Sequence, residues 1–423
     1  MKSYLERRRE RVAAAWNLND DVVLVGAGRP IPIPGGADQT YPYLAHSDYY
    51  YLADREVPGG VVAFDPKEGW VDFVPDITTA ERVWEGKSDI RGTPMSKFDD
   101  WLTARTGRTL AVLGCPVPGI TGDAVRSAEL AQALLHARRP KDEVELERMR
   151  AAAAATAPGY EAARRMIQSG VTERQIQVEL ESGFFRHGAT RTAYDTIVAS
   201  GANSAVLHFP PTSRVVEAGD IVLIDAGAAT GRYVSDVTRT YRAPGGDGSA
   251  FRDLYTLVLD VEQRAISHCT ARREWQEVHF EAALGIVTGL VALGFLKGSP
   301  QSLVETDAHA LFFPHGLGHM VGLGVRDAGG RAPGRTQSQR PGLSNLRLDL
   351  PLEVGYAVTV EPGIYFIRAL LNDRENREKY SAAVDWGRVD AMLDFGGIRI
   401  EDNVVITAGE PEVLTAAIPK TLD

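Results

Sequence analysis

The chain has 423 residues, 44% hydrophobic and 24% charged, a composition typical of globular proteins and unlike disordered or membrane-spanning chains. Its 46 basic and 56 acidic residues give a net charge of −10, the wrong sign for binding nucleic-acid phosphates. The length suggests two or three domains, and two cysteines are too few for a disulfide framework. Residues 1–16 are charged throughout and unlike a signal peptide, so we expect a cytoplasmic protein.

Short strand-like runs in the first 140 residues predict a small α/β domain. The segments Val22–Val25, Val61–Phe64 and Leu110–Leu113 are apolar and rich in β-branched residues, and turns and polar helices separate them. A cluster of charged residues and proline occupies positions 138–143. We therefore expect one domain over residues 1–140 and a second over 141–423.

The second domain is expected to be α+β with mainly antiparallel strands. A capping-box pair, Thr172 with Gln175, predicts a helix start, and Gly188 suits the position after its end. The expected helices cover residues 144–166 (despite Pro158), 172–187, 251–269 and 278–295. The expected strands cover residues 221–225, 234–241, 357–361 and 398–406. The Gly-, Arg- and Pro-rich segment 328–341 is expected to be a long loop.

The segment 221–241 has the pattern of a β-hairpin, because an apolar run and an alternating run flank a turn candidate at Thr230 and Gly231. With those two residues at the centre of the turn, Asp225 and Asp236 are cross-strand partners. Their Cβ atoms would lie about 4.5–5.5 Å apart on one face, where unpaired carboxylates repel each other. A bulge would change this register. The sequence thus predicts a positive charge between the two aspartates.

Two further acids occupy similar settings. Glu361 ends the apolar run 357–360, and Glu401 lies within the β-branched segment 396–406. An unpaired charge is costly in such a strand, so these acids, with Asp225 and Asp236, suggest shared cations. The alternative is that the two aspartates are solvated on an exposed face.

Two histidines, His315 and His319, lie four residues apart in a glycine-rich segment. Such a pair also occurs as a polar surface feature. With the oxygen-rich acids, however, an imidazole suits a hard or borderline divalent ion such as Mn²⁺, with Co²⁺ or Zn²⁺ as alternatives. Two metals about 3.5–4 Å apart would generate a hydroxide nucleophile and polarise a carbonyl. The implied chemistry is hydrolysis.

These segments together resemble the dinuclear-metal Xaa-Pro peptidases of the creatinase and methionine aminopeptidase, or pita-bread, superfamily. The matching segments come in the family's order and are 197–208, 225–240, 315–319, 359–365 and 397–402. The resemblance covers about residues 143–423, and segments 41–52 and 81–86 look like the N-terminal domain of these enzymes. It implies an α+β chain, with a small α/β creatinase-type N-terminal domain before a pita-bread catalytic domain.

The resemblance also implies residue roles at the matching positions. Two divalent ions, Mn(II) first, are held by five ligands, of which Asp236 and Glu401 bridge both ions. The implied metal ligands are Asp225, Asp236, His319, Glu361 and Glu401. Glu361 would also carry a proton from the nucleophilic water to the leaving proline nitrogen.

Four more residues receive roles in the same way. His208 matches the histidine that stabilises the developing oxyanion, and His315 matches the one lining the proline side of the cleft. Arg399 and Thr238 would hold the carboxylates in position. Without its motif, His208 would be interpreted as an interior histidine with satisfied nitrogens.

Prolidases of this family cleave dipeptides, whereas aminopeptidases P accept longer chains. A dipeptidase must recognise the free carboxylate of its substrate, and an arginine fork provides that contact. Arg347 falls at the position of such an arginine in a loop that resembles the prolidase loop. The family usually has His-Asp where this chain has Arg326-Asp327, so Arg326 either binds the carboxylate or closes the pocket in another way.

The leading hypothesis is a cytoplasmic, homodimeric Xaa-Pro dipeptidase, with the N-terminal domain of one chain narrowing the cleft of its partner. The alternative enzyme is aminopeptidase P, which releases the N-terminal residue from longer peptides with proline second. A non-catalytic binding scaffold and creatinase-like chemistry are remoter alternatives on the same fold. Neither nucleic acid nor a membrane is expected as a partner.

Overall fold

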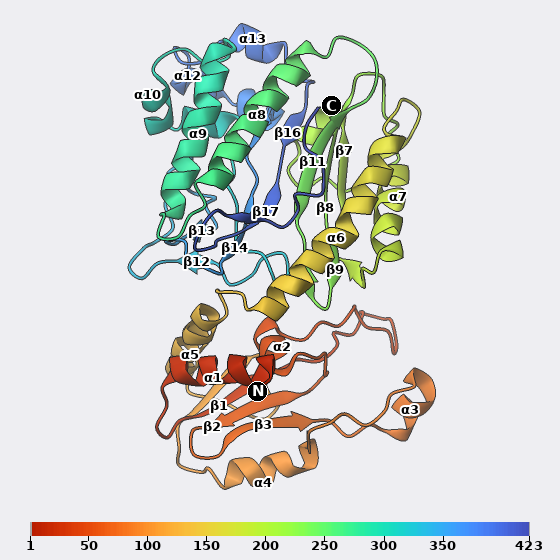
Figure 1. The fold of residues 1–423 in the computed structure, drawn as a ribbon, viewed down its shortest axis with the longest axis vertical. Coiled ribbons are helices and arrows are strands. Elements are labelled where there is room, and N and C mark those ends of the chain that lie inside the picture. The colour runs from red at the N-terminus through yellow and green to blue at the C-terminus, as the bar shows by residue number, and fades with distance from the viewer. Residues whose placement is uncertain (1, 423) are drawn as a thin grey trace. The chain divides into compact units, whose positions relative to one another are not determined.

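The computed structural model describes residues 2–422, and the chain divides into two compact units, one ending at Arg138 and one beginning at Arg139 (Figure 1). Each unit has its own hydrophobic core. Among residues 2–422, none of the helices combines the length and the apolarity that crossing a bilayer requires.

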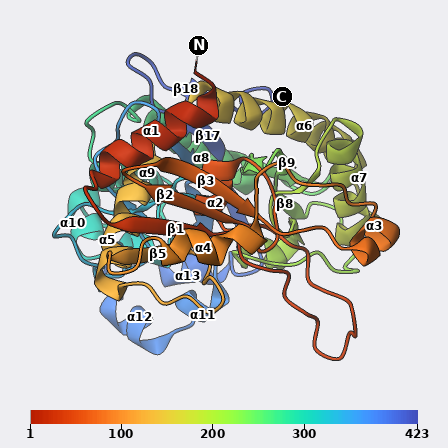
Figure 2. The ribbon, with the colours of Figure 1, turned by 90° about the horizontal axis from the view of Figure 1, so that it is seen from below.

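The first unit is built on one mixed sheet with strand order β4-β3-β2-β1-β5 (Figure 2). Strand β1 pairs antiparallel with the central strand β2 and parallel with β5, and every residue of β1 and β2 is buried. The strands are β1 (Val22–Gly26), β2 (Val61–Asp65), β3 (Gly69–Val74), β4 (Thr93–Pro94) and β5 (Leu110–Gly114). The helices are α1 (Tyr4–Trp16), α2 (Ser47–Ala53), α3 (Thr79–Glu85), α4 (Phe98–Thr103) and α5 (Ala124–Ala137). The three predicted strands are therefore confirmed.

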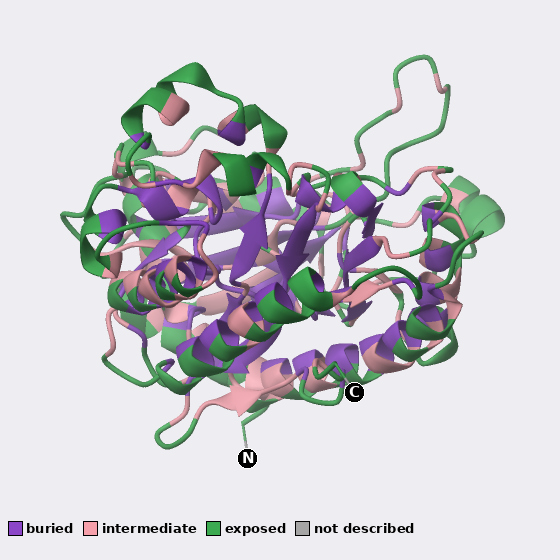
Figure 3. Cartoon of the chain, turned by 90° about the horizontal axis from the view of Figure 1, so that it is seen from above, coloured by how far each residue is buried: buried purple, intermediate pink, exposed green. Residues whose placement is uncertain are grey.

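Long helices flank the strands of the second unit, and Figure 3 shows buried strands between helices whose outer faces are exposed. The helices are α6 (Glu143–Met166), α7 (Glu173–Arg186), α8 (Ser249–Ser267), α9 (Trp275–Ala292), α10 (Pro300–Glu305), α11 (Arg368–Leu371), α12 (Arg374–Lys379) and α13 (Trp386–Asp390). The predicted capping box of α7 is present, and α6 continues through Pro158. Helix α9 begins three residues before its predicted start, because Trp275 is fully buried and extends the apolar face.

The strands of the second unit form small sheets, antiparallel except for the pair β12 and β13. They are β6 (Arg191–Thr192), β7 (Ile197–Ser200), β8 (Ile221–Ala226), β9 (Ala228–Thr230), β10 (Tyr233–Val234), β11 (Val237–Arg242), β12 (Gly330–Arg331), β13 (Leu348–Asp349), β14 (Ala357–Val360), β15 (Gly363–Tyr365), β16 (Gly397–Arg399), β17 (Asp402–Val405) and β18 (Glu412–Val413). The mainly antiparallel pairing is as predicted, and segment 328–341 is a loop apart from β12.

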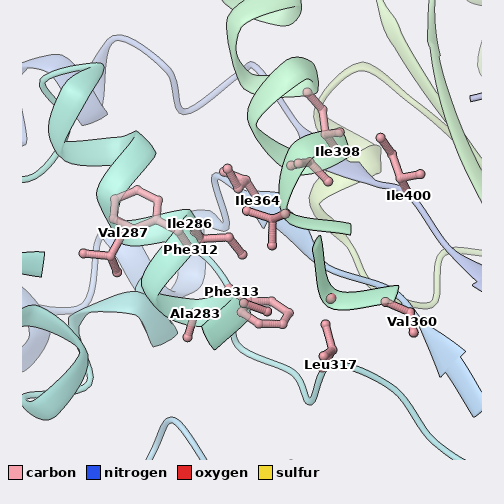
Figure 4. Close-up of a cluster of buried hydrophobic side chains, with 14 of the residues drawn as sticks. Ala283, Ile286, Val287, Phe312, Phe313, Leu317, Val360, Ile364, Ile398 and Ile400 are labelled. Carbon is pink, nitrogen blue, oxygen red and sulfur yellow. The ribbon is translucent and has the colours of Figure 1, made fainter. Parts of the chain in front are cut away.

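A large apolar core fixes the strands that carry the later site residues. In Figure 4, Ile286 of α9 lies beside Phe312, and Ile364 of β15 and Ile398 of β16 belong to the same cluster. All four side chains are fully buried. Burying an aliphatic or aromatic side chain of this size contributes about 1.5–3 kcal/mol. The strands that carry polar residues into the site are therefore held from behind by apolar packing.

The predicted register of the hairpin was wrong. Asp225 lies opposite Thr238, and Thr230 lies opposite Tyr233, so the central turn residues are Gly231 and Arg232. Both have left-handed φ values, 50° and 72°, as a two-residue type I′ turn requires. Because the shift from the predicted register is two residues, every side chain keeps its face of the sheet. Asp225 and Asp236 are therefore diagonal neighbours rather than direct partners.

Three of the four acids end or interrupt the strands in which they were predicted, whereas Asp225 lies within β8. The expected strand 398–406 is split into β16 and β17 around Glu401, and the expected strand 234–241 is split around Asp236. Glu361 directly follows β14. Near Asp236 the two strands of the hairpin approach so closely that a Cβ on Gly227 would lie 1.9 Å from the carbonyl oxygen of Ser235. These interruptions free the acids from regular side-chain alternation.

Candidate metal centre

The side chains of Asp236, His319 and Glu401 offer ligand atoms that all lie within 4.8 Å of one another. Glu361 adjoins them, with its Oε1 atom 3.6 Å from Nε2 of His319. The backbone explains this convergence, because the Glu361 N–H donates to Leu317 and the Thr359 N–H donates to His319. The segment after β14 and the glycine-rich histidine segment are thereby held side by side.

The protonation of His319 leaves one nitrogen directed at the acids. Its Nδ1 atom lies 3.0 Å from the carbonyl oxygen of Met320, which only accepts hydrogen bonds, so Nδ1 carries the proton. Burial lowers the pKa of His319 to about 3, so the ring is neutral and Nε2 has a free lone pair. Nε2 faces Asp236 Oδ2 at 3.5 Å, beyond hydrogen-bond length. A lone pair that faces carboxylate oxygens fits a bound cation.

The carboxyl groups at the centre repel one another. Burial and then the neighbouring acids raise the pKa of Asp236, Glu361 and Glu401 well above the usual values. Asp236 and Glu401 are 4% and 2% exposed, so water screens the repulsion poorly. Divalent cations would remove this penalty, and the set of carboxylate oxygens with one imidazole has the donor chemistry that Mn²⁺ prefers. The residues present therefore fit the metal site.

Asp225 is held differently from the other acids. Its Oδ1 atom accepts a hydrogen bond from Tyr194 and its Oδ2 atom accepts one from Arg399, both at 2.6 Å. Thr238, behind this centre, donates to Glu401 at 2.6 Å and accepts from Arg399 at 2.9 Å. Arg399 and Thr238 thus contact the carboxylates of Asp225 and Glu401, and their role in holding a metal site stays a prediction.

A chain of hydrogen bonds continues from Arg399 to His315. Arg399 donates to the Tyr365 hydroxyl, and that hydroxyl lies 2.9 Å from Nε2 of His315. Nδ1 of His315 faces the carbonyl oxygen of Gly316 at 2.9 Å. Burial lowers the pKa of His315 to about 3, so the ring is neutral and Tyr365 donates to it. Both nitrogens of His315 therefore have protein partners, and the residue offers the cleft a ring surface.

His208 is exposed at the edge of the site. Neither of its ring nitrogens has a hydrogen-bond partner within residues 2–422, and burial, followed by the charge of Arg399, lowers its pKa. A neutral imidazole with free nitrogens is available to a ligand. Arg326 and Arg347 are also exposed, and neither guanidinium has an ion-pair or hydrogen-bond partner in the described part of the chain.

Most of these groups line one cavity of about 590 Å³, whereas Thr238 and Tyr365 lie outside its lining. The sequence-predicted residues on its wall are His208, Asp225, Asp236, His315, His319, Arg326, Arg347, Glu361, Arg399 and Glu401. A second polar cavity of about 370 Å³ shares His319, Arg326, Asn345 and Arg347 with the first. Arg326 and Arg347 therefore line both cavities, and they share the first cavity with the acids.

Three residues of this arrangement were missed in the sequence. Tyr194 and Tyr365 bind Asp225 and Arg399, and Asn403 binds the backbone N–H and carbonyl of Asp236 through its side chain. Tyr365 lies in a segment that carried the resemblance, but no spacing in the sequence indicates that its hydroxyl contacts Arg399 and His315. No spacing signal identifies Tyr194, because it comes from a separate segment before β7.

The model of metallopeptidase family M24 matches residues 147–408. The chain belongs to this family. It is 35% identical over 368 residues to an Xaa-Pro dipeptidase of Xanthomonas campestris pv. campestris (strain 8004), with 85% of this chain and 81% of that protein covered. It is also 28% identical over 410 residues to a probable Xaa-Pro aminopeptidase of Tuber melanosporum (strain Mel28), with 94% and 90% covered.

Solved structures agree with this assignment. Aminopeptidase PepP of Pseudomonas aeruginosa superposes with a TM-score of 0.79 at 27% identity, covering 100% of this chain and 97% of that one. Aminopeptidase P from Escherichia coli with the inhibitor Pro-Leu superposes with a TM-score of 0.80 at 26% identity and the same coverage. The expected superfamily and α+β fold are confirmed. The chain is a metallopeptidase of the Xaa-Pro group, and its relatives include both proteins named dipeptidase and proteins named aminopeptidase.

Proposed function

We propose that this chain is a dinuclear-metal exopeptidase that hydrolyses the Xaa-Pro bond of dipeptides. The observation that carries the proposal is a single cavity with a metal-binding acidic floor and two unpartnered guanidiniums, Arg326 and Arg347, on its wall. Positive groups in the same cavity as the acids suit a substrate whose free carboxylate lies one residue beyond the scissile bond.

Five residues would hold the metal ions, with Asp236 and Glu401 shared between them. The proposed ligands are Asp225, Asp236, His319, Glu361 and Glu401. When bound, two divalent ions, which we propose to be Mn(II), polarise a carbonyl and lower the pKa of water. Co(II) and Zn(II) suit the same donors. Arg399 and Tyr194 orient Asp225 from behind through its two oxygens.

The remaining residues act on the substrate. Glu361 accepts the proton of the attacking water and delivers it to the proline nitrogen as that nitrogen leaves. His208 donates a hydrogen bond to the oxyanion that develops at the scissile carbonyl, which its free nitrogens support. The His315 ring packs against the proline side chain, while Arg347 and Arg326 bind the carboxylate.

The test compares Xaa-Pro, Xaa-Pro-amide and Xaa-Pro-Xaa after chelation and reloading with Mn²⁺. We expect hydrolysis of the dipeptide, with a kcat/KM at least tenfold above that of the amide. Loss of one charge-assisted hydrogen bond costs about 1.5–3 kcal/mol, which corresponds to such a ratio. Faster turnover of the tripeptide supports aminopeptidase P instead. No turnover, with no metal bound by elemental analysis, would support the non-catalytic scaffold.

We also propose a cytoplasmic homodimer. Support for association comes from α3, where the neighbouring Val83 and Trp84 are 73% and 85% exposed, since large apolar side chains are rarely left so open on a monomer. Both cysteines, Cys115 and Cys269, are unbonded, which suits a reducing compartment. Light scattering should give twice the 45.9 kDa chain mass.

A further inference from the structure

We propose that Glu173 is a positioning residue for His208: its buried carboxylate closes the loop between Ser200 and Thr212 and so holds the imidazole at the cleft. This inference rests on the proposed function, because it assigns Glu173 a part in the reaction through His208. Glu173 lies outside the cavity and touches no substrate position.

The Glu173 side chain joins both ends of the loop. Its Oε1 atom accepts hydrogen bonds from the Ser200 N–H and hydroxyl, both at 2.8 Å, and from the Asn203 amide at 3.1 Å. Its Oε2 atom accepts from the Thr212 N–H at 3.0 Å and the Thr212 hydroxyl at 2.6 Å. One carboxylate therefore receives five donors, two from Ser200 before the turn, one from Asn203 within it and two from Thr212 at the end of the loop.

The surroundings of Glu173 favour the charged form of its carboxylate. Glu173 is fully buried and is the first residue of α7, where the helix dipole favours a negative charge. Burial acts to raise its pKa, but hydrogen bonds from Thr212, Asn203 and Ser200 outweigh burial, and the pKa of Glu173 lies below its usual value. A glutamine would turn its amide N–H₂ toward the backbone N–H of Ser200 or of Thr212, and neither N–H can accept a hydrogen bond.

The part of the loop that carries His208 depends on these ends. After the 3-10 turn Gly201–Ala205 the chain bends at Val206 and turns at Leu207 and His208, and His208 has no hydrogen bond of its own within residues 2–422. Ser204 donates to Gly201 and accepts from the Gly397 N–H, which fixes the turn against β16. Beyond His208, the chain is held by Arg174, whose side chain donates to Pro211 and whose N–H donates to Thr212, and by the backbone and side chain of Glu173. Releasing the carboxylate therefore loosens the segment on both sides of the imidazole.

A double-mutant cycle with Glu173→Gln and His208→Ala tests the inference. Removing an oxyanion donor costs about 100-fold or more in kcat, and we expect His208→Ala to do so. We expect Glu173→Gln to lower kcat at least tenfold in the wild-type background and less than twofold in the His208→Ala background. A residue that only supports the fold would cost the same factor in both backgrounds.

Hydrogen exchange of the metal-loaded protein provides a readout that is independent of turnover. Glu173→Gln should speed amide exchange in residues 201–212, whereas the control Thr172→Ala, which removes the neighbouring helix cap, should speed exchange only at the start of α7. Thr212→Val removes one of the five donors and replaces Glu173→Gln in the test if that variant does not fold. It should lower kcat by a smaller factor, and this factor should again be smaller in the His208→Ala background than in the wild type.

The outcomes separate the two proposals. Equal losses from Glu173→Gln in both backgrounds, or unchanged exchange in residues 201–212, would overturn the positioning role and leave the proposed function intact. Full turnover in His208→Ala would overturn the role of His208 in the reaction, and the role of Glu173 with it.

Discussion

Two imidazoles in the cleft, the partly buried His315 and the buried His319, differ in the hydrogen bonds that they offer although both are neutral. Each directs Nδ1 at a backbone carbonyl, so each presents Nε2 as an acceptor. Tyr365 occupies Nε2 of His315, whereas Nε2 of His319 faces Asp236 and Glu361 beyond hydrogen-bond distance. The tautomer and the neighbours of each ring therefore leave Nε2 of His319 free to accept from a cation, whereas both nitrogens of His315 already have protein partners.

Glu361→Gln should abolish turnover with the fold retained. The amide cannot accept a proton from water, and loss of a general base costs about 10²–10⁴-fold. Peptide hydrolysis and thermal unfolding measure the two effects. Glu353→Gln, a few residues earlier on an exposed site, is the matched control and should behave like the wild type. Substantial hydrolysis by Glu361→Gln would contradict the proton-carrying role.

At the scale of elements, helices α6 and α7 approach through two glycines. A Cβ on Gly183 would lie 2.4 Å from the Cα atom of Gly159, and a Cβ on Gly159 would lie 2.5 Å from the carbonyl oxygen of Leu180. Both obstacles are backbone atoms, which no side-chain rotation relieves. Glu173 is the first residue of α7. The contact between the two helices therefore also fixes the position of the Glu173 carboxylate, which holds the loop that carries His208.

Gly183→Ala should therefore destabilise the protein although alanine is the better helix former. The propensity gain is about 1 kcal/mol, whereas overpacking a tight core contact costs about 1–3 kcal/mol, and contact with backbone belongs at the upper end. We expect a net loss of about 1–2 kcal/mol in urea denaturation. Val178→Ala on the exposed face of α7 is the control, with a change below about 0.5 kcal/mol. Equal effects of the two changes would refute the packing argument.

At the scale of the whole molecule, the first unit has a buried ion-pair cluster of its own, far in sequence from the proposed metal ligands. Asp65 at the end of β2 is 1% exposed and binds Arg105 at 2.7 Å and Arg108 at 2.8 Å. Hydrogen bonds from Arg108 hold the pKa of Asp65 well below its usual value, against the effect of burial. The carboxylate is therefore more acidic in the folded than in the unfolded chain.

This difference predicts a pH-dependent stability. A folded pKa below the unfolded value of about 3.9 adds stability above that pH and loses it as the pH falls toward the folded value. Asp65→Asn should cost about 3 kcal/mol near pH 7, and its deficit against the wild type should shrink below about pH 4. Urea denaturation across this range measures it. The control is Asp20→Asn, which changes an exposed partner of Arg108 and should have little effect on stability. A loss of stability in Asp65→Asn that stays constant across this pH range would contradict the ion-pair explanation.

The sequence by itself determined which residues gather at the site. Acids that end or interrupt apolar strands, such as Asp225 and Glu361, are too costly to bury without cations, and this cost is visible in a one-dimensional pattern. The helices of the second unit were also predictable, because caps such as Thr172 with Gln175 and the apolar period are local signals.

Only the tertiary structure decided the register, the proton positions and the partners. The turn moved to Gly231 and Arg232 because the type I′ geometry places both central residues in the left-handed region. The pairing of Tyr365 with Arg399 and His315, and of Glu173 with Thr212, joins segments far apart in the chain. Such contacts arise when separately specified elements pack together, and no local period or cap in the sequence encodes them.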